Sequence, residues 1–215
     1  MKFGFYLFLF FFIFLPSLVK PQGGFSKKVM PGLSAGLNAS NQEIRWDGPN
    51  QPSSMLARSR ASFELEKPVN RRLSLQLSLG YAQHGSNNVA LSGEKELLNY
   101  IESAIQAIEY KPIGGSDIYL SFGTFFAYGI AGERKTYAGM PIENELFTKN
   151  GYNRLDWGLL GNIGVKFSGG TFIQTGLKGA LNNCFQSDGL RYYNFALMAT
   201  VGQTFGWKAH NKIRR

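Results

Sequence analysis

The sequence has few of the side chains that many catalytic and metal-binding functions require. Its 215 residues include one cysteine, Cys184, and two histidines, His84 and His210. A single cysteine excludes an intrachain disulfide, so the fold must be held by hydrogen bonding and packing. The two histidines are far apart, and neither is surrounded by a cluster with metal-ligand spacing. No glycine-rich phosphate loop is present either. The sequence therefore predicts neither a metal nor another cofactor.

Charge is also scarce. Charged residues make up 17% of the chain, whereas a soluble domain usually carries about 25%. Glycine is frequent, with 26 residues, and the net charge is +9. Low charge with high glycine is typical of a barrel whose outer wall touches lipid and whose interior is crowded. The lysines and arginines are scattered, so we predict no nucleic-acid partner. The basic excess favours anionic lipid headgroups or glycolipid phosphates.

The longest apolar run lies at the N-terminus and is short. It extends from Phe3 to Leu15, follows Lys2 and ends before Pro16. About 13 apolar residues suit a signal-peptide core, whereas a membrane-spanning helix needs about 20. We expect residues 1–20 to be a signal peptide, cleaved near 20–22, and residues 21–31 to be a periplasmic segment.

What the chain does have is alternation. In RRLSLQLSLGYAQHG, residues 71–85, leucines and a tyrosine take the odd positions and polar or small residues the even ones. This period of two predicts a strand with one apolar and one polar face. Six further segments alternate in the same way: 32–40, 54–67, 117–130, 154–167, 171–182 and 192–206. An eighth, 99–111, also fits a helix, with Ile101, Ala104, Ile105 and Ile108 at helical spacing. We favour a strand, because it completes an even count.

The connectors between these segments alternate in length. Segments 41–53, 84–98, 132–153 and 183–191 are long, whereas 68–71, 112–117 and 168–170 are short. Bacterial outer-membrane barrels have short periplasmic turns, longer outer loops and an even number of strands. We therefore predict an all-β, eight-stranded antiparallel up-and-down transmembrane β-barrel over 32–206, followed by a basic periplasmic tail at 207–215. The alternative is a soluble lipocalin-like or avidin-like ligand-binding barrel with its apolar face inside.

The polar face is predicted to line the lumen. An eight-stranded barrel is only just wide enough for side chains to fill it, and charges buried there must pair. We expect a plugged lumen with a structural charge network; an ion path is the alternative. The predicted members are Arg58, Arg60, Glu64, Arg72, Glu102, Asp156, Lys166 and Lys178.

Several stretches carry a resemblance to a known family. GLSAGLNAS, LSLQLSLGYAQHGS, LNYIE and the closing FALMATVGQTFG resemble the outer-membrane β-barrel family common in Bacteroidota, which includes PorT of the type IX secretion system. The resemblance departs at Ser103 and Ala104 and at the final KAHNKIRR. It implies a Gram-negative outer-membrane location and a non-enzymatic role in binding or in an envelope or secretion assembly. The implied partners are outer-membrane lipids, glycolipid and other envelope or secretion proteins.

One stretch suggests an enzyme instead. His84 and Ser86, with Glu94 or Glu96, resemble the base, nucleophile and orienting acid of lipid A deacylases of the PagL type. The strand pattern places His84 on the lumen side, whereas a lipid-cleaving site must face the bilayer, so we predict no enzyme.

The long loop at 133–154 and the aromatic residues of the strands have non-catalytic interpretations. The loop is long enough to be functional, and its candidate partner contacts are Tyr137, Met140, Phe147 and Tyr152. The aromatic residues of the strands could form anchoring girdles. The outer girdle would hold Tyr128, Trp157 and Tyr193, and the inner girdle Phe167 and Phe205.

Overall fold

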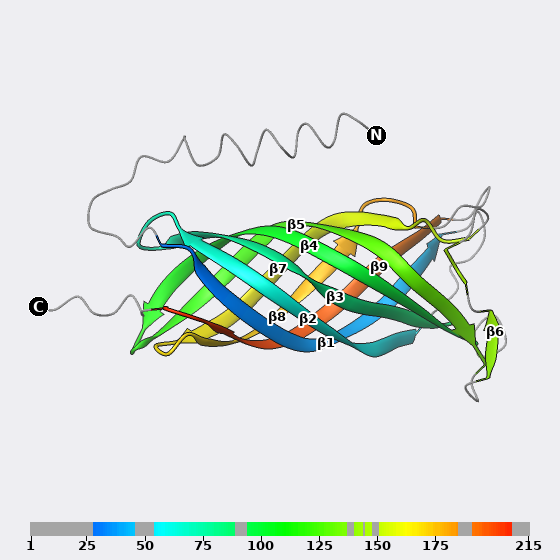
Figure 1. The fold of residues 1–215 in the computed structure, drawn as a ribbon, viewed down its shortest axis with the longest axis horizontal. Helices are drawn as coiled ribbons and strands as arrows, with labels where there is room; N and C mark the ends of the chain where they lie inside the picture. The colour runs from blue at the N-terminus through cyan, green and yellow to red at the C-terminus, as the bar shows by residue number, and fades with distance from the viewer. Residues whose placement is uncertain are drawn as a thin grey trace, which may run out of the picture.

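A computed structural model describes residues 28–45, 54–88, 94–136, 140–143, 145–147, 151–184 and 191–207 of the chain. They form β1 (Met30–Arg45), β2 (Ser54–Pro68), β3 (Leu73–Asn88), β4 (Glu94–Ile113), β5 (Ser116–Lys135), β6 (Pro141–Glu143), β7 (Leu155–Phe167), β8 (Thr171–Ala180) and β9 (Arg191–Thr204) (Figure 1). Among these residues, no helix is long and apolar enough to cross a bilayer.

Eight of the strands close into a ring. Each long strand pairs antiparallel with its neighbours in the chain, β1 pairs with β9, and the β4–β5 pairing completes the barrel. The short β6 pairs only with the end of β5. The predicted eight-stranded antiparallel up-and-down barrel is therefore confirmed. Residues 99–111 lie within β4, so the favoured strand prediction for that segment is also correct.

Strands β3, β4 and β5 are longer than the apolar pattern predicts. The expected long connector at 84–98 is wrong, because β3 and β4 remain paired from Gln83↔Asn99 up to Asn88↔Glu94. The backbone ladder continues beyond the apolar part of the wall, where the outward positions no longer need to be apolar. Alternation of apolar residues therefore underestimates the length of these strands.

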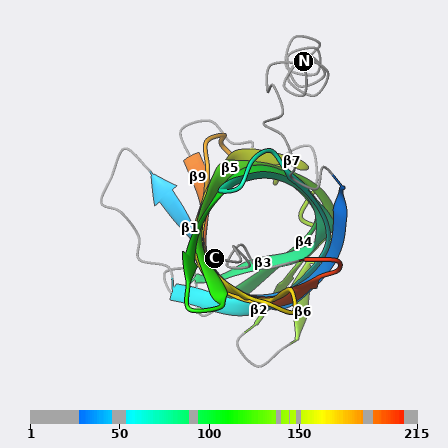
Figure 2. The same cartoon turned by 90° about the vertical axis from the view of Figure 1, so that its left-hand side faces the viewer.

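The two ends of the barrel differ, and we call them the turn end and the loop end. The turn end holds the short connections 69–72, 114–115 and 168–170, together with the start of β1 and the end of β9, where Gly32 pairs with Thr204. Figure 2 views the barrel from this end. The β4–β5 hairpin turns on Gly114 and Gly115, whose φ angles are 55° and 97°. Two consecutive positive φ angles are the requirement of a tight type I′ hairpin, which glycine meets without strain.

The apolar face of the wall points outward. Burial alternates along the long strands, and most of the exposed positions are apolar. This exterior apolar belt includes Leu33, Leu37, Phe63, Leu79, Leu120, Phe122, Ile163, Ile173, Leu177 and Val201. The predicted girdle residues Tyr128, Trp157, Phe167 and Phe205 lie on the same outer face, and Tyr193 is half-buried. A lipocalin-like barrel has the opposite arrangement, with its apolar face inside.

Candidate functional site: a filled lumen

The turn end of the lumen is closed by an aromatic box around a buried lysine. Lys166 Nζ lies 2.5 Å from Glu66 Oε2 and donates to the Tyr110 hydroxyl at 2.9 Å, and that hydroxyl donates to Glu66 Oε1 at 2.8 Å. Trp207, just after β9, places its ring centroid 4.3 Å from Lys166 Nζ. Tyr119 and Phe172 complete the box. The first residue of the predicted tail is therefore part of the barrel's closure; residues 208–215 lie outside the described residues.

A chain of hydrogen-bonded side chains, which we call the septum, links the inward faces of β1, β2, β3, β4 and β7 within the lumen. Ser34 Oγ donates to Glu64 at 2.7 Å, and Gln76 Nε2 donates to the same carboxylate at 2.9 Å. Gln106 Nε2 donates to Gln76 Oε1 at 3.2 Å, and Asn162 Nδ2 donates to Gln106 Oε1 at 2.7 Å. The cavity beside this septum has a volume of about 10 Å³, which is close to the space that one water molecule needs.

A charge cluster lies above the septum, toward the loop end. Lys178 Nζ contacts Glu102 Oε2 and lies 2.9 Å from His84 Nε2. Arg60 Nη2 lies 3.7 Å from Glu102 Oε1, and the Phe125 ring centroid is 4.7 Å from Lys178 Nζ. Two cations thus share one buried carboxylate. This arrangement satisfies the charges by pairing rather than by exposure to solvent.

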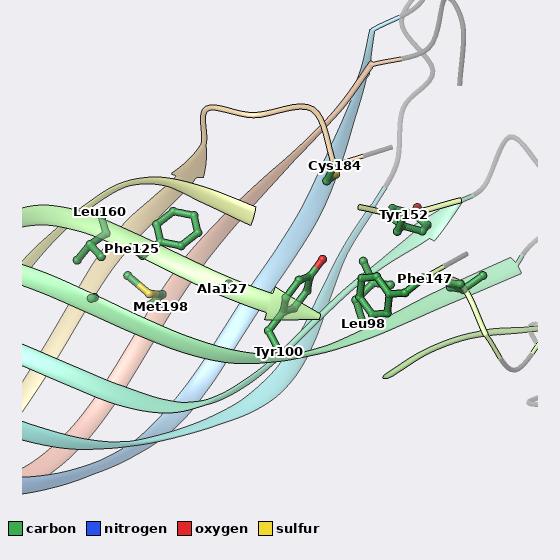
Figure 3. Close-up of a cluster of buried hydrophobic side chains, with 11 residues drawn as sticks. Leu98, Tyr100, Phe125, Ala127, Phe147, Tyr152, Leu160, Cys184 and Met198 are labelled. Carbon is green, nitrogen blue, oxygen red and sulfur yellow. The ribbon is translucent and has the colours of Figure 1, made fainter. Parts of the chain in front are cut away.

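The loop end is closed by a cap, which we define as Leu146, Phe147 and Tyr152. All three side chains are buried, and they pack with Leu98, Tyr100 and Cys184 in one apolar cluster (Figure 3).

Backbone and side-chain contacts hold the cap in the mouth of the barrel. Leu146 N donates to Gly132 O at 3.1 Å, and the Tyr152 hydroxyl donates to Glu96, which also pairs with Arg134 at 2.7 Å. Gly129 makes room for the cap, because a Cβ there would lie 2.2 Å from Phe147 Cζ.

The predicted partner contacts differ in where the structure places them. Phe147 and Tyr152 are buried in the cap, so their assignment to an exposed partner surface is wrong: the apolar part of the loop folds inward over Gly129 and Gly132. Met140 is exposed, with 64% of its surface accessible. Tyr137 lies outside the described residues.

The predicted lumen charges are distributed over several levels rather than gathered in one network. The structure brings Arg60, Glu102 and Lys178 together, whereas Glu64 belongs to the septum. Asp156 accepts a hydrogen bond from Asn194 at 2.7 Å. Of the remaining predicted members, Lys166 lies in the aromatic box, Arg58 is half-buried on an inward-facing position of β2, and Arg72 is exposed in the 69–72 turn.

Arg72 is therefore not a lumen residue, because β3 begins only at Leu73. Several contributors were not among the predicted network members, among them Glu66, Tyr110 and Trp207 of the aromatic box. Glu66 shares the inward parity of Glu64 on β2, so the alternation itself identifies it. Nothing in the local sequence signals that Trp207 turns back under the barrel.

The structure places most residues of the enzyme alternative inside the barrel. His84 is bound to Lys178 within the charge cluster, and Ser86 is 1% exposed on the same inward face. Glu96 is held by Arg134 and Tyr152 beneath the cap, and Glu94 lies 3.6 Å from Arg134. All of these side chains except Glu94 are buried inside the barrel, away from the outer wall that a lipid substrate would reach.

No protein-family model matches this chain, and no curated protein matches it. Among solved structures, it is similar to Ail of Yersinia pestis in complex with the heparin analogue sucrose octasulfate, at 12% identity over 81% of this chain and 99% of Ail, with a TM-score of 0.39. It is also similar to the Neisserial surface protein NspA, at 10% identity over 81% of this chain and 97% of NspA, with a TM-score of 0.46. Outer membrane protein W of E. coli is also similar, at 11% identity over 84% of this chain and 100% of that protein, with a TM-score of 0.44. The closed ring itself rests on the strand pairing of this chain.

Proposed function

We propose that this chain is an outer-membrane β-barrel of a Gram-negative bacterium, with its apolar belt embedded in lipid. Hydrogen bonding closes around the ring, and lipid cannot satisfy an open sheet edge. Outward-facing charges bound the belt at both ends. Lys95, Glu133 and Lys135 follow it on the loop-end side, and Lys67 and Glu109 follow it on the turn-end side.

The filling of the lumen carries the functional part of the proposal. An aromatic box, a septum, a charge cluster and a cap occupy successive levels of the lumen in the described residues, and this filling favours a barrel that neither conducts nor binds a substrate inside. Its function then belongs to its surfaces. It acts without catalysis, either by binding or as a subunit of an envelope or secretion assembly. The family resemblance of the sequence favours a type IX-like assembly, with lipids, glycolipid and envelope proteins as partners.

A crosslinking pull-down from native membranes tests this proposal. The expected result is that the complete chain co-purifies with envelope proteins. A variant lacking the loop tip at 136–140, or one lacking residues 208–215, should lose some of them. Ile173→Leu, a conservative change in the lipid-facing belt, is the matched control and should lose none. Recovery of the barrel alone from every sample would refute a role in an assembly.

The enzyme alternative has its own test. Ser86→Ala should leave the mass spectrum of extracted lipid A unchanged, because the serine is enclosed in the barrel. A lipid A species that changes on this substitution while the barrel still folds would show that the chain is an enzyme.

A further inference from the structure

The turn end of the barrel carries an excess of exposed positive charge. Among the described residues, five exposed cations lie there with one exposed acid, Glu109. None of the five forms an ion pair with a described residue. We call this set the turn-end basic patch, and its members are Lys28, Lys67, Arg71, Arg72 and Lys111.

The patch lies on one side of the ring. Its members come from the segment before β1, from β2, from the β2–β3 turn and from β4. Strands β1 to β4 are consecutive neighbours in the barrel. On the opposite side, the exposed residues at the turn ends of β7, β8 and β9 are uncharged: Phe167, Thr171 and Phe205. At the loop end, the described cations Arg134, Lys135 and Arg154 are paired with acids, as in Lys135–Glu133 at 2.7 Å.

An apolar wall lies next to the cations. On β2 the outward residues that precede Lys67 are Phe63 and Leu65, and on β4 the outward residues Ile105 and Ala107 are followed by Glu109 and then by Lys111. Long cationic side chains at such a boundary reach toward headgroups while their stems cover apolar surface. The combination fits an amphiphile with an anionic head and acyl chains. An acidic protein would need the cations but not the wall above them.

We infer that the turn-end basic patch binds anionic phospholipid, with the headgroup phosphate on Lys67, Arg71, Arg72 and Lys111 and the acyl chains along the outer faces of β2 to β4. This inference rests on the proposed membrane location. It adds that the barrel prefers anionic phospholipid over neutral lipid and that this lipid binds at the turn-end basic patch. Each cation near a lipid surface strengthens such binding about fivefold.

Native mass spectrometry of the complete barrel, released from nanodiscs of equal parts phosphatidylglycerol and phosphatidylethanolamine, tests the inference. The wild type should retain phosphatidylglycerol preferentially. Lys67→Gln with Lys111→Gln should lower the ratio of the two bound lipids at least fivefold. The matched control, Lys95→Gln with Lys135→Gln, removes the same charge from outward positions at the loop end and should leave the ratio unchanged.

The outcomes separate this inference from the membrane proposal. Wild type and variants should all insert into neutral phosphatidylcholine vesicles and show heat-modifiable migration on a gel; failure of the wild type to do so overturns the membrane location. If all insert but the wild type shows no preference, or both double variants lose it equally, the lipid inference is wrong. It is also wrong if the patch variant keeps its lipid ratio and instead loses a crosslinked acidic protein.

Discussion

The buried ion pair of Lys166 and Glu66 shows how a charge is stabilised inside this barrel by a specific partner. Lys166 and Glu66 are 2% and 1% exposed, and the Tyr110 hydroxyl bonds to both. Removing one member of such a pair leaves an uncompensated buried charge, whereas removing both removes the cost of desolvating them. The stability of the turn end should therefore depend on whether the charges of Lys166 and Glu66 balance each other, more than on the presence of either side chain.

We predict that Lys166→Met lowers the free energy of unfolding by about 3–5 kcal/mol, because it strands the Glu66 carboxylate. Adding Glu66→Gln should recover more than half of the loss, since an amide oxygen still accepts from Tyr110. Urea unfolding in lipid vesicles, followed by far-UV circular dichroism, measures both values. The control Lys111→Met removes an exposed cation and should change stability by less than about 0.5 kcal/mol. Equal losses in the single and double variants would contradict the pairing argument.

Cys184 gives a second prediction at this scale. The thiol is fully buried in the cap cluster, and burial raises its pKa well above the ordinary range. Because only the thiolate reacts, maleimide labelling at pH 8 should be at least about 100-fold slower in the folded barrel than in urea. Met140→Cys in a Cys184→Ala background provides an exposed comparison and should label quickly in both states. Rapid labelling of folded wild type would mean that the cap does not cover Cys184.

At the scale of elements, the period-two pattern predicts the barrel well, because lipid and lumen impose opposite polarities on alternate side chains. The pattern becomes weak where lipid ends. The outer parts of β3 to β5 were therefore expected as loop, and the inward fold of Phe147 and Tyr152 was not expected at all. A loop's apolar residues do not reveal whether they face a partner or the chain's own interior. Gly129 and Gly132 on the inward face of β5 leave the space in which the cap packs. Their role can be recognised only after the structure has shown where the cap lies.

The fit between β5 and the cap leads to a prediction. Gly129→Ala places a methyl group where Phe147 packs, 2.2 Å from Cζ, and overpacking of this kind costs about 1–3 kcal/mol. The cost should fall when Phe147→Ala is already present, giving a coupling of at least about 1 kcal/mol in a double-mutant cycle. Gly161→Ala is the matched control on β7, where the nearest atom to the new Cβ is 3.6 Å away. Additive effects of Gly129→Ala and Phe147→Ala would show that the cap does not pack on Gly129.

At the scale of the whole molecule, several separate layers of side chains fill the lumen, so its blockage does not depend on any one of them. Eight strands give an interior that side chains just fill, and here the filling comes from all eight strands, from the residue after β9 and from the β5–β7 loop. The box at the turn end and the cap at the loop end lie on either side of the septum and the charge cluster. Removing either end closure therefore leaves the central layers intact.

Planar-bilayer recording tests this redundancy. The wild type should show no steady conductance, and neither should Phe147→Ala with Trp207→Ala, because the septum from Ser34 to Asn162 still fills the lumen between the two ends. Truncating the septum itself, with Gln76→Ala and Gln106→Ala in the same background, should produce small, short-lived openings, since the hydrogen-bonded chain is then broken at two consecutive links. Steady porin-like steps in the wild type would mean that the lumen is open and that transport, rather than surface binding, is the function to pursue.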